Sequence, residues 1–153
     1  MKKRGFTLIE LIVVVLIMII IIGMSLASYN NFNEEKKLDS DADKLTDILE
    51  MARKKSIAAE IVAPCTSFQG YAVDISTSSY KLQQCCDDSC TDFSSYNLAG
   101  TNQVISGIGN IRFKPLLGEI SNDNLITIEN KITTKSISIN ISPLGIIEEG
   151  HHE

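Results

Sequence analysis

The sequence predicts an α+β fold in which a long N-terminal helix packs on an antiparallel β-sheet. Three observations support this prediction. The chain of 153 residues opens with a long apolar run. Apolar residues then recur at three- and four-residue steps, the spacing of an amphipathic helix, until shortly before Pro64. Beyond the proline the pattern changes to two-residue alternation, which is typical of strands with one buried face.

The first segment has the length of a membrane span. Seventeen residues run from Phe6 to Ile22, and only Thr7 and Glu10 among them are not apolar. As a helix they cover about 26 Å, and about 33 Å if the helix continues through Ala27. A hydrocarbon core is roughly 30 Å thick. We therefore expect a transmembrane helix over 6–27, with the basic residues 2–4 cytoplasmic and the rest of the chain extracytoplasmic.

Glu10 is the unexpected residue of this apolar run. An acidic side chain at the centre of a membrane helix costs about 2.5–3.5 kcal/mol, and such charges are rare without a partner or a function. No basic side chain follows within the run. Cleavage after Gly5 places a new α-amino group on Phe6, one helical turn before Glu10 or within reach of Glu10 in a neighbouring chain. We therefore interpret Glu10 as a functional carboxylate.

The segment Lys3-Arg4-Gly5-Phe6-Thr7-Leu8-Ile9-Glu10-Leu11 resembles the N-terminal signature of type IV pilins and pseudopilins. The resemblance implies a leader over 1–5, cleavage after Gly5 by a prepilin peptidase and N-methylation of Phe6. It also implies that Glu10 guides assembly against the N-terminus of an adjacent subunit. The fold that it implies is pilin-like, which agrees with the predicted long helix packed on an antiparallel sheet. One departure is visible. Many members have proline where this chain has Ala27, so the helix kink common in the family is in doubt.

A second helical pattern covers residues 28–63, and we expect one continuous helix from Phe6 to Ile61 with a weak point at 28–33. Its apolar stripe is formed by Leu38, Ala42, Leu45, Leu49, Ala52 and Ala59, with Ser56 on the same stripe. The charged residues lie largely off this stripe, namely Asp41, Asp43, Lys44, Asp47, Glu50, Arg53, Lys54 and Lys55. Such an amphipathic helix needs a cover for its apolar face. Pro64 bars further extension, because the residue before a proline prefers extended geometry.

Residues 64–149 are predicted to form a β-rich extracytoplasmic domain, followed by a disordered tail over 150–153. The expected strands are 70–75 and 80–84, joined as a hairpin, and then 111–113, 125–129 and 136–142. Alternation is cleanest in the last of these, where every second residue is isoleucine. The segment from Cys86 to Asn102 is expected to be a loop held by cysteines. The sheet provides the cover that the helix needs.

Four cysteines, Cys65, Cys85, Cys86 and Cys90, all fall on the predicted outer side of the membrane. An even count in an oxidising compartment favours disulfides. Pairing of Cys85 with Cys86 is disfavoured, because adjacent Cα atoms are about 3.8 Å apart and disulfides usually need more. Cys65 is therefore expected to pair with one of these neighbours and Cys90 with the other. A zinc site is the alternative, but the spacing lacks paired Cys-x-x-Cys motifs.

Composition argues against an enzyme. The only histidines are His151 and His152 at the extreme C-terminus, so a Ser-His-acid triad is implausible, and we interpret them as a frayed tail or an artificial extension. Without the three basic residues of the leader, 11 basic face 19 acidic side chains, a side-chain charge of −8. Nucleic acid is therefore not expected as a partner. A DNA contact through Lys36, Lys37 and Arg53–Lys55 is the less favoured interpretation.

No cofactor is expected, although two acidic loops are weak candidates for calcium. The candidate ligands are Asp87, Asp88 and Asp92 in the cysteine loop, and residues 122–124. Neither segment has EF-hand spacing, so a solvated loop is the preferred interpretation.

Two details resemble minor pseudopilins of the GspH/FimT type. Leu49–Ile57 is similar to a helix segment of that group, and 113–118 and 139–145 are similar to its paired strand-then-glycine turns. The resulting hypothesis is a filament subunit whose partners are prepilin peptidase, other pilin or pseudopilin subunits, an inner-membrane assembly platform and the lipid bilayer. The alternatives are a membrane-anchored binding domain that does not polymerise and a DNA-uptake minor pilin.

Overall fold

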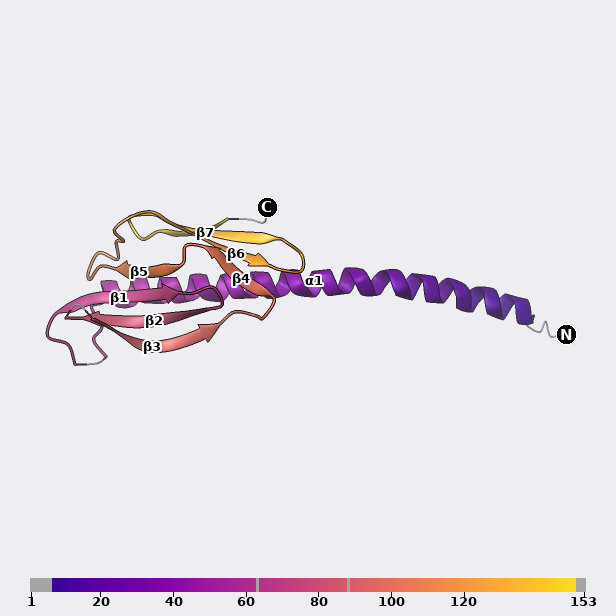
Figure 1. Cartoon of the computed structure of the whole chain (residues 1–153), viewed down its shortest axis with the longest axis horizontal. Coiled ribbons are helices and arrows are strands. Elements are labelled where there is room, and N and C mark those ends of the chain that lie inside the picture. Colours follow the sequence, from indigo (N-terminus) through magenta and orange to yellow (C-terminus); the bar gives the residue numbers. More distant parts are fainter. Residues whose placement is uncertain (1–6, 63, 88, 151–153) are drawn as a thin grey trace, which may run out of the picture. The chain divides into compact units, whose positions relative to one another are not determined.

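The structure is a computed structural model that describes residues 7–62, 64–87 and 89–150, without the side chains of residues 23–28. The chain divides into two compact units, Met1–Asn33 and Glu34–Glu153. Helix α1, Leu8–Ile57, contributes to both units, and the boundary between them falls beside the segment 28–33 that was predicted to be weak. In the second unit, strands follow the helix (Figure 1).

Helix α1 ends earlier than the predicted Ile61. Ala59 adopts a left-handed backbone conformation with φ of 48°. The N–H groups of Ala59 and Glu60 donate to the carbonyl oxygens of Ser56 and Lys55, which is the Schellman arrangement of a helix C-terminus. The helix therefore stops because its last carbonyls are satisfied locally, several residues before Pro64. Ala59, which was predicted to continue the apolar stripe, lies beyond the helix.

The strands form two four-stranded antiparallel sheets, and the predicted single sheet is thus divided. Sheet A has the order β3-β2-β1-β5 and sheet B the order β4-β6-β7-β8. Sheet A consists of β1 (Phe68–Ile75), β2 (Ser79–Cys86), β3 (Ser89–Asn97) and β5 (Gly109–Phe113). Sheet B consists of β4 (Asn102–Ser106), β6 (Asn124–Asn130), β7 (Ser136–Ile141) and β8 (Ile147–Gly150). The predicted α+β class, a helix packed on antiparallel strands, is confirmed.

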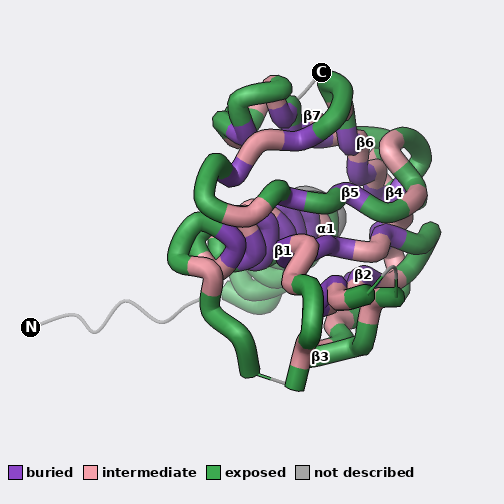
Figure 2. The backbone as a smooth tube through the Cα atoms, turned by 90° about the vertical axis from the view of Figure 1, so that its left-hand side faces the viewer, coloured by how far each residue is buried: buried purple, intermediate pink, exposed green. Residues whose placement is uncertain are grey.

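The core of the second unit lies between the helix and the two sheets. Figure 2 shows the buried turns of α1 among the strands of the domain. The predicted stripe supplies the helical side of this core, because Leu38, Ala42, Leu45, Leu49, Ala52 and Ser56 are all fully buried. The strands contribute Tyr71, Val73, Leu82 and Phe113 from sheet A, and Ile126, Ile128, Ile139 and Ile141 from sheet B. The alternating isoleucines of β7 thus face inward, as predicted.

The predicted loop from Cys86 to Asn102 is wrong, because most of it is strand β3. Residues of β3 pair with β2 from Cys86 opposite Ser89 to Ser79 opposite Asn97. The strand is an edge strand, and all of its residues are exposed or half-buried. Its sequence therefore carries serine, threonine and aspartate instead of an apolar alternation, so the pattern was not recognisable. Strands β4 and β8 were also missed, and β8 includes Gly150 of the predicted tail.

Asp41 corrects a second prediction. It was placed among the charges off the apolar stripe, yet only 5% of it is exposed. One of its carboxylate oxygens accepts hydrogen bonds from the backbone N–H of Ala99 at 2.7 Å and from Nδ2 of Asn102 at 2.8 Å. Asn130 Nδ2 in turn donates to Asn102 Oδ1 at 2.7 Å and to Glu34 Oε2 at 3.2 Å. This buried polar network joins two turns of α1 to β4 and β6.

Glu34 is expected to make folding pH-dependent. Its pKa is lowered from the ordinary value of 4.5 to about 2, chiefly by the hydrogen bond from Lys37, with Thr101 and Asn130 adding to the effect. Because the folded state binds the proton less readily than the unfolded state, this contribution is complete above pH 4.5 and is lost as the pH falls towards 2. In urea unfolding at pH 6 and pH 2.5, Glu34→Gln should lose less stability between the two conditions than the unaltered chain. Equal losses contradict the assignment.

Candidate functional site

The apolar residues at the start of α1 are exposed on every face of the helix. Each large apolar side chain from Leu8 to Ile22 has at least 45% of its area exposed, and Leu8 reaches 78%. An amphipathic helix buries one stripe and leaves a polar face. Here no face is polar or buried, so this surface requires lipid or other apolar chains around it.

Glu10 lies in the first turn of this helix and is held by Thr7. The Thr7 backbone N–H and hydroxyl donate to Glu10 Oε2 at 3.3 and 3.2 Å, and the Glu10 N–H donates to Thr7 Oγ1 at 3.4 Å. This reciprocal pattern is a capping box, with Thr7 as the N-cap and Glu10 three positions later. The carboxylate also lies at the positive end of the helix dipole. The sequence signal, Thr-x-x-Glu before an apolar run, was present but was not used.

Gly5 and Phe6 lie outside the described residues. The structure therefore describes Glu10 and its partner Thr7. Cleavage after Gly5 and methylation of Phe6 stay predictions. Among the described residues no basic side chain contacts Glu10, so a capping role alone also accounts for its geometry. The two roles are compatible, because a carboxylate at a helix N-terminus retains acceptor positions for a further donor.

Comparison with known families decides how this end of the chain is interpreted. Residues 1–26 match the family described as the prokaryotic N-terminal methylation motif. The chain carries a prepilin-type N-terminal signature. This motif supports prepilin processing and a type IV pilin-like character, and it suggests anchoring in a membrane and assembly into a filament. No curated protein and no solved structure matches the chain.

Over the part of the chain that the structure describes, no helix is long and apolar enough to cross a membrane.

The four cysteines of this prepilin-like chain form two disulfides, which confirms that prediction. Cys65 is joined to Cys86, and Cys85 to Cys90. The first bond ties the segment after α1 to the end of β2. The second bond crosses the hairpin between β2 and β3, where Cys85 and Cys90 lie directly opposite. The sequence left open which of the neighbours Cys85 and Cys86 pairs with Cys65. The structure assigns Cys86 to Cys65 and Cys85 to Cys90.

Two acidic residues of the cysteine loop that were considered for calcium, Asp87 and Asp92, have partners within the protein. Asp87 accepts hydrogen bonds from the backbone N–H groups of Thr66 and Ser67, one on each carboxylate oxygen. Asp92 accepts from Lys81 at 2.7 Å and from Gln83 at 2.8 Å. Asp88 lies outside the described residues. Within the described ranges, no three histidine, cysteine or acidic side chains are grouped as metal ligands. Asp87 and Asp92 are therefore structural residues of the β2–β3 hairpin.

The basic residues considered for a DNA contact are engaged within the domain. Lys54 pairs with Glu50 at 2.5 Å and Lys37 with Glu34 at 2.6 Å. Lys36 pairs with Asp39 at 3.0 Å. Lys55 pairs with Glu60 at 2.6 Å and lies over the rings of Tyr71 and Phe93. His151 and His152 lie outside the described residues. These ion pairs favour the interpretation of a solvated helix face.

The two glycine turns come together against α1. A Cβ on Gly145 lies 2.0 Å from the carbonyl oxygen of Gly118, and a Cβ on Gly118 lies 2.8 Å from the Ile57 side chain. Arg53 lies beneath both turns and donates from Nη2 to the Leu144 carbonyl at 3.4 Å. Both glycines have positive φ, so they permit a close approach of the two backbones that a side chain prevents.

Proposed function

We propose that this protein is a structural subunit, a minor pilin or pseudopilin, of a type IV pilus-like or type II secretion filament. One observation carries the proposal. A methylation motif leads directly into a helix that exposes apolar side chains on all faces and has a single carboxylate in its first turn. A simple anchor needs the apolar surface, and it has no use for the charge of Glu10 beyond capping the first turn of the helix.

The proposed mechanism is assembly and not catalysis. The helix is stored in the inner membrane as a single span, with a cytoplasmic N-terminus and an extracytoplasmic disulfide-bonded domain. Prepilin peptidase removes the leader after Gly5, and Phe6 is methylated. The new amine of Phe6 pairs with Glu10 of a neighbouring subunit in a low-dielectric environment, where an ion pair is strong and an unpaired charge is costly.

Thr7 contributes to this mechanism by fixing the rotamer of Glu10. Because the carboxylate is held against the first turn of α1, it projects at a defined height along the helix. A pairing at that height sets the axial register between subunits, while the apolar side chains of Leu8–Ile22 pack against those of neighbours. One heterologous contact repeated without closure generates a helical filament.

The first experiment is mass spectrometry of filaments sheared from the source cells and of the remaining membranes. A peptide that starts at methylated Phe6 in the filament fraction is the expected result. A small amount there, with most of the processed protein in membranes, identifies a minor subunit, whereas a dominant amount identifies a major pilin. An intact N-terminus at Met1, found only in membranes, contradicts the proposal and leaves a membrane-anchored domain that does not polymerise.

Glu10→Ala is expected to leave membrane insertion intact and to abolish incorporation into filaments, measured as the ratio of filament to membrane protein. Glu10→Gln separates the two roles of the residue, because glutamine also completes a capping box but carries no charge. Loss of incorporation in both variants supports the charge pairing. Normal incorporation of Glu10→Gln contradicts it and leaves helix capping as the function of Glu10.

A further inference from the structure

The disulfide between Cys85 and Cys90 lies on the face of sheet A that is turned away from the core. Successive residues of a strand face opposite sides, and Leu82 of β2 points into the core, so Cys85, three residues later, faces outward. Cys85 is nevertheless fully buried, whereas Cys90 on the edge strand β3 is half-buried. A reagent that comes from the solvent therefore reaches Cys90 more easily than Cys85.

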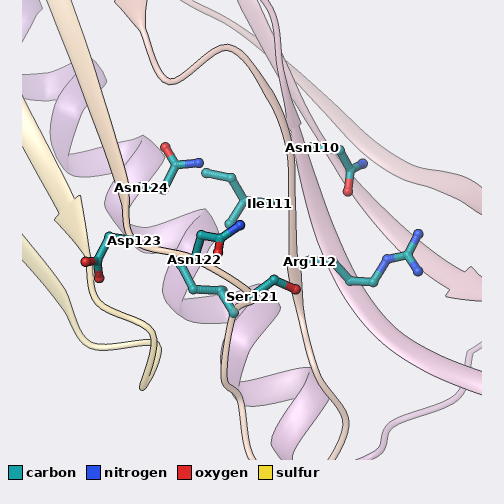
Figure 3. Close-up of a pocket in the computed structure, with 8 residues that line it drawn as sticks. Asn110, Ile111, Arg112, Ser121, Asn122, Asp123 and Asn124 are labelled. Carbon is teal, nitrogen blue, oxygen red and sulfur yellow. The ribbon is translucent and has the colours of Figure 1, made fainter.

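The Arg112 guanidinium lies against this disulfide. Its Nη2 donates to Cys90 Sγ at 3.5 Å, and its Nη1 donates to Gln69 Oε1 at 2.9 Å. Arg112 is among the residues that line a pocket of about 290 Å³ beside β5, but its side chain points away from residues 121–124 on the other wall (Figure 3). The cation is therefore directed to the sulfur of Cys90 and not into the pocket.

Gln69 holds Arg112 in this position from β1. The register between β1 and β2 shifts between Phe68 and Gly70, and Gln69 is the extra residue of this β-bulge. A bulge re-aims the side chain at one position of a sheet. The Gln69 amide oxygen is thereby available to the guanidinium on the outer face, and the hydrogen bond restrains the cation beside the disulfide.

The charge of Arg112 is not neutralised by its surroundings. In the parts of the chain that the structure describes, no carboxylate forms an ion pair with Arg112. Asp92 shares the outer face with Cys90, two residues further along β3, but it is paired with Lys81 at 2.7 Å. Asp87, between β2 and β3, accepts from two backbone N–H groups. An arginine beside a cysteine stabilises its thiolate, which is the nucleophilic form.

We propose that Cys90 is the residue through which this disulfide forms: activated by Arg112, it reacts first with a disulfide-containing oxidant and then transfers that bond to Cys85. In the first step the Cys90 thiolate attacks one sulfur of the oxidant, whose S–S bond breaks and releases one thiolate. In the second step Cys85 loses its proton, attacks Cys90 Sγ and displaces the other oxidant sulfur. Two protein thiols are oxidised, the oxidant is reduced to two thiols, and the two protein thiol protons pass to them.

The same arrangement selects Cys85 over its neighbour Cys86. Cys85 lies directly opposite Cys90, whereas Cys86 faces the other side of the strand and is bonded to Cys65. Arg112 is brought to Cys90 only when β5 pairs with β1, so the activation of Cys90 depends on the folded sheet. The proposal does not depend on filament assembly, since it uses only residues of the second unit.

The test re-oxidises the unaltered full chain, reduced in detergent micelles, with glutathione disulfide as the oxidant. Samples are quenched with acid, and the glutathione adducts are located by mass spectrometry. At early times at least about fivefold more adduct is expected on Cys90 than on Cys85. Concentrated urea should abolish the difference, because it separates Arg112 from Cys90. Equal adducts on the two cysteines without urea, or a preference that survives in urea, overturn the proposal.

A pair of variants isolates the contribution of the Arg112 charge. Cys85→Ser leaves Cys90 without its disulfide partner, and alkylation of Cys90 by iodoacetamide is measured with Arg112 present and in Arg112→Gln, which keeps an amide donor but has no charge. The rate at pH 7 should be about threefold lower in Arg112→Gln, and at pH 10, where the thiol is ionised in both, the rates should coincide. Equal rates at pH 7 overturn the proposal. A difference that persists at pH 10 reports access and not charge, and it also overturns the proposal.

Discussion

Gly70→Ala is expected to destabilise the domain by about 3–5 kcal/mol. Gly70 lies at the start of β1, in a left-handed region with φ of 103°, where the register between β1 and β2 shifts. A Cβ at this position lies 2.0 Å from the carbonyl oxygen of Phe113 and 3.3 Å from the hydroxyl of Ser56. The substitution therefore combines backbone strain with displacement of β5 or α1 from the core.

Two glycines of the same domain separate these contributions. Gly109 has φ of 136° and open space around its Cβ position, so Gly109→Ala measures strain alone, about 1–2 kcal/mol. Gly100 has open space and no positive φ, so Gly100→Ala should lie within about 0.5 kcal/mol of the unaltered chain. Urea unfolding followed by tyrosine fluorescence is suitable, because the chain has no tryptophan. Equal effects for Gly70→Ala and Gly109→Ala contradict the steric explanation.

Asp41→Ala is expected to cost about 2–4 kcal/mol, because it leaves buried donors without an acceptor. The Ala99 N–H and the Asn102 amide both donate to the same oxygen of Asp41. Asn102 also accepts from Asn130, so the loss should extend to the contact between β4 and β6. The measurement is the free energy of unfolding, with amide exchange at Ala99 as a local readout.

Asp43→Ala is the matched control, since it removes an exposed acidic side chain two residues away on the same helix. Its effect should not exceed about 0.5 kcal/mol. Asp41→Asn keeps one acceptor oxygen of the right shape and should fall between the two alanine variants. If Asp41→Ala and Asp43→Ala have the same stability, the network does not fix the helix against sheet B.

The elements that could be predicted from the sequence are those that bury one face, because their apolar residues then recur at a regular spacing. The stripe from Leu38 to Ala52 and the isoleucines of β7 are such cases, and both form the core. Strand β3 was missed because an edge strand with two wet faces has no apolar alternation. The end of α1 was misplaced because Ala59, and not the expected Gly or Pro, adopts the left-handed conformation of the C-cap.

The candidate site was predictable to a similar extent. Glu10 was recognised because a carboxylate is costly in an apolar run, whereas its partner Thr7 was overlooked although the capping-box spacing was visible. Two disulfide pairings remained after the sequence analysis, because the Cα atoms of the adjacent Cys85 and Cys86 are too close for these two residues to pair with each other. The choice between them depends on the register of β2 against β3. Cys85 lies directly opposite Cys90 and is bonded to it, whereas Cys86 lies opposite Ser89.

By itself, the sequence determined the N-terminal prepilin-type signature, the helix that follows it and the strand patterns with one buried face, since each depends on residues close together in the chain. Only the tertiary structure decided the division into two sheets, the buried position of Asp41 and the pocket beside β5. These features depend on which backbone and polar groups distant segments bring together. Aspartate is usually found at the surface. Asp41 is buried because Ala99 and Asn102, some sixty residues later, supply its hydrogen bonds.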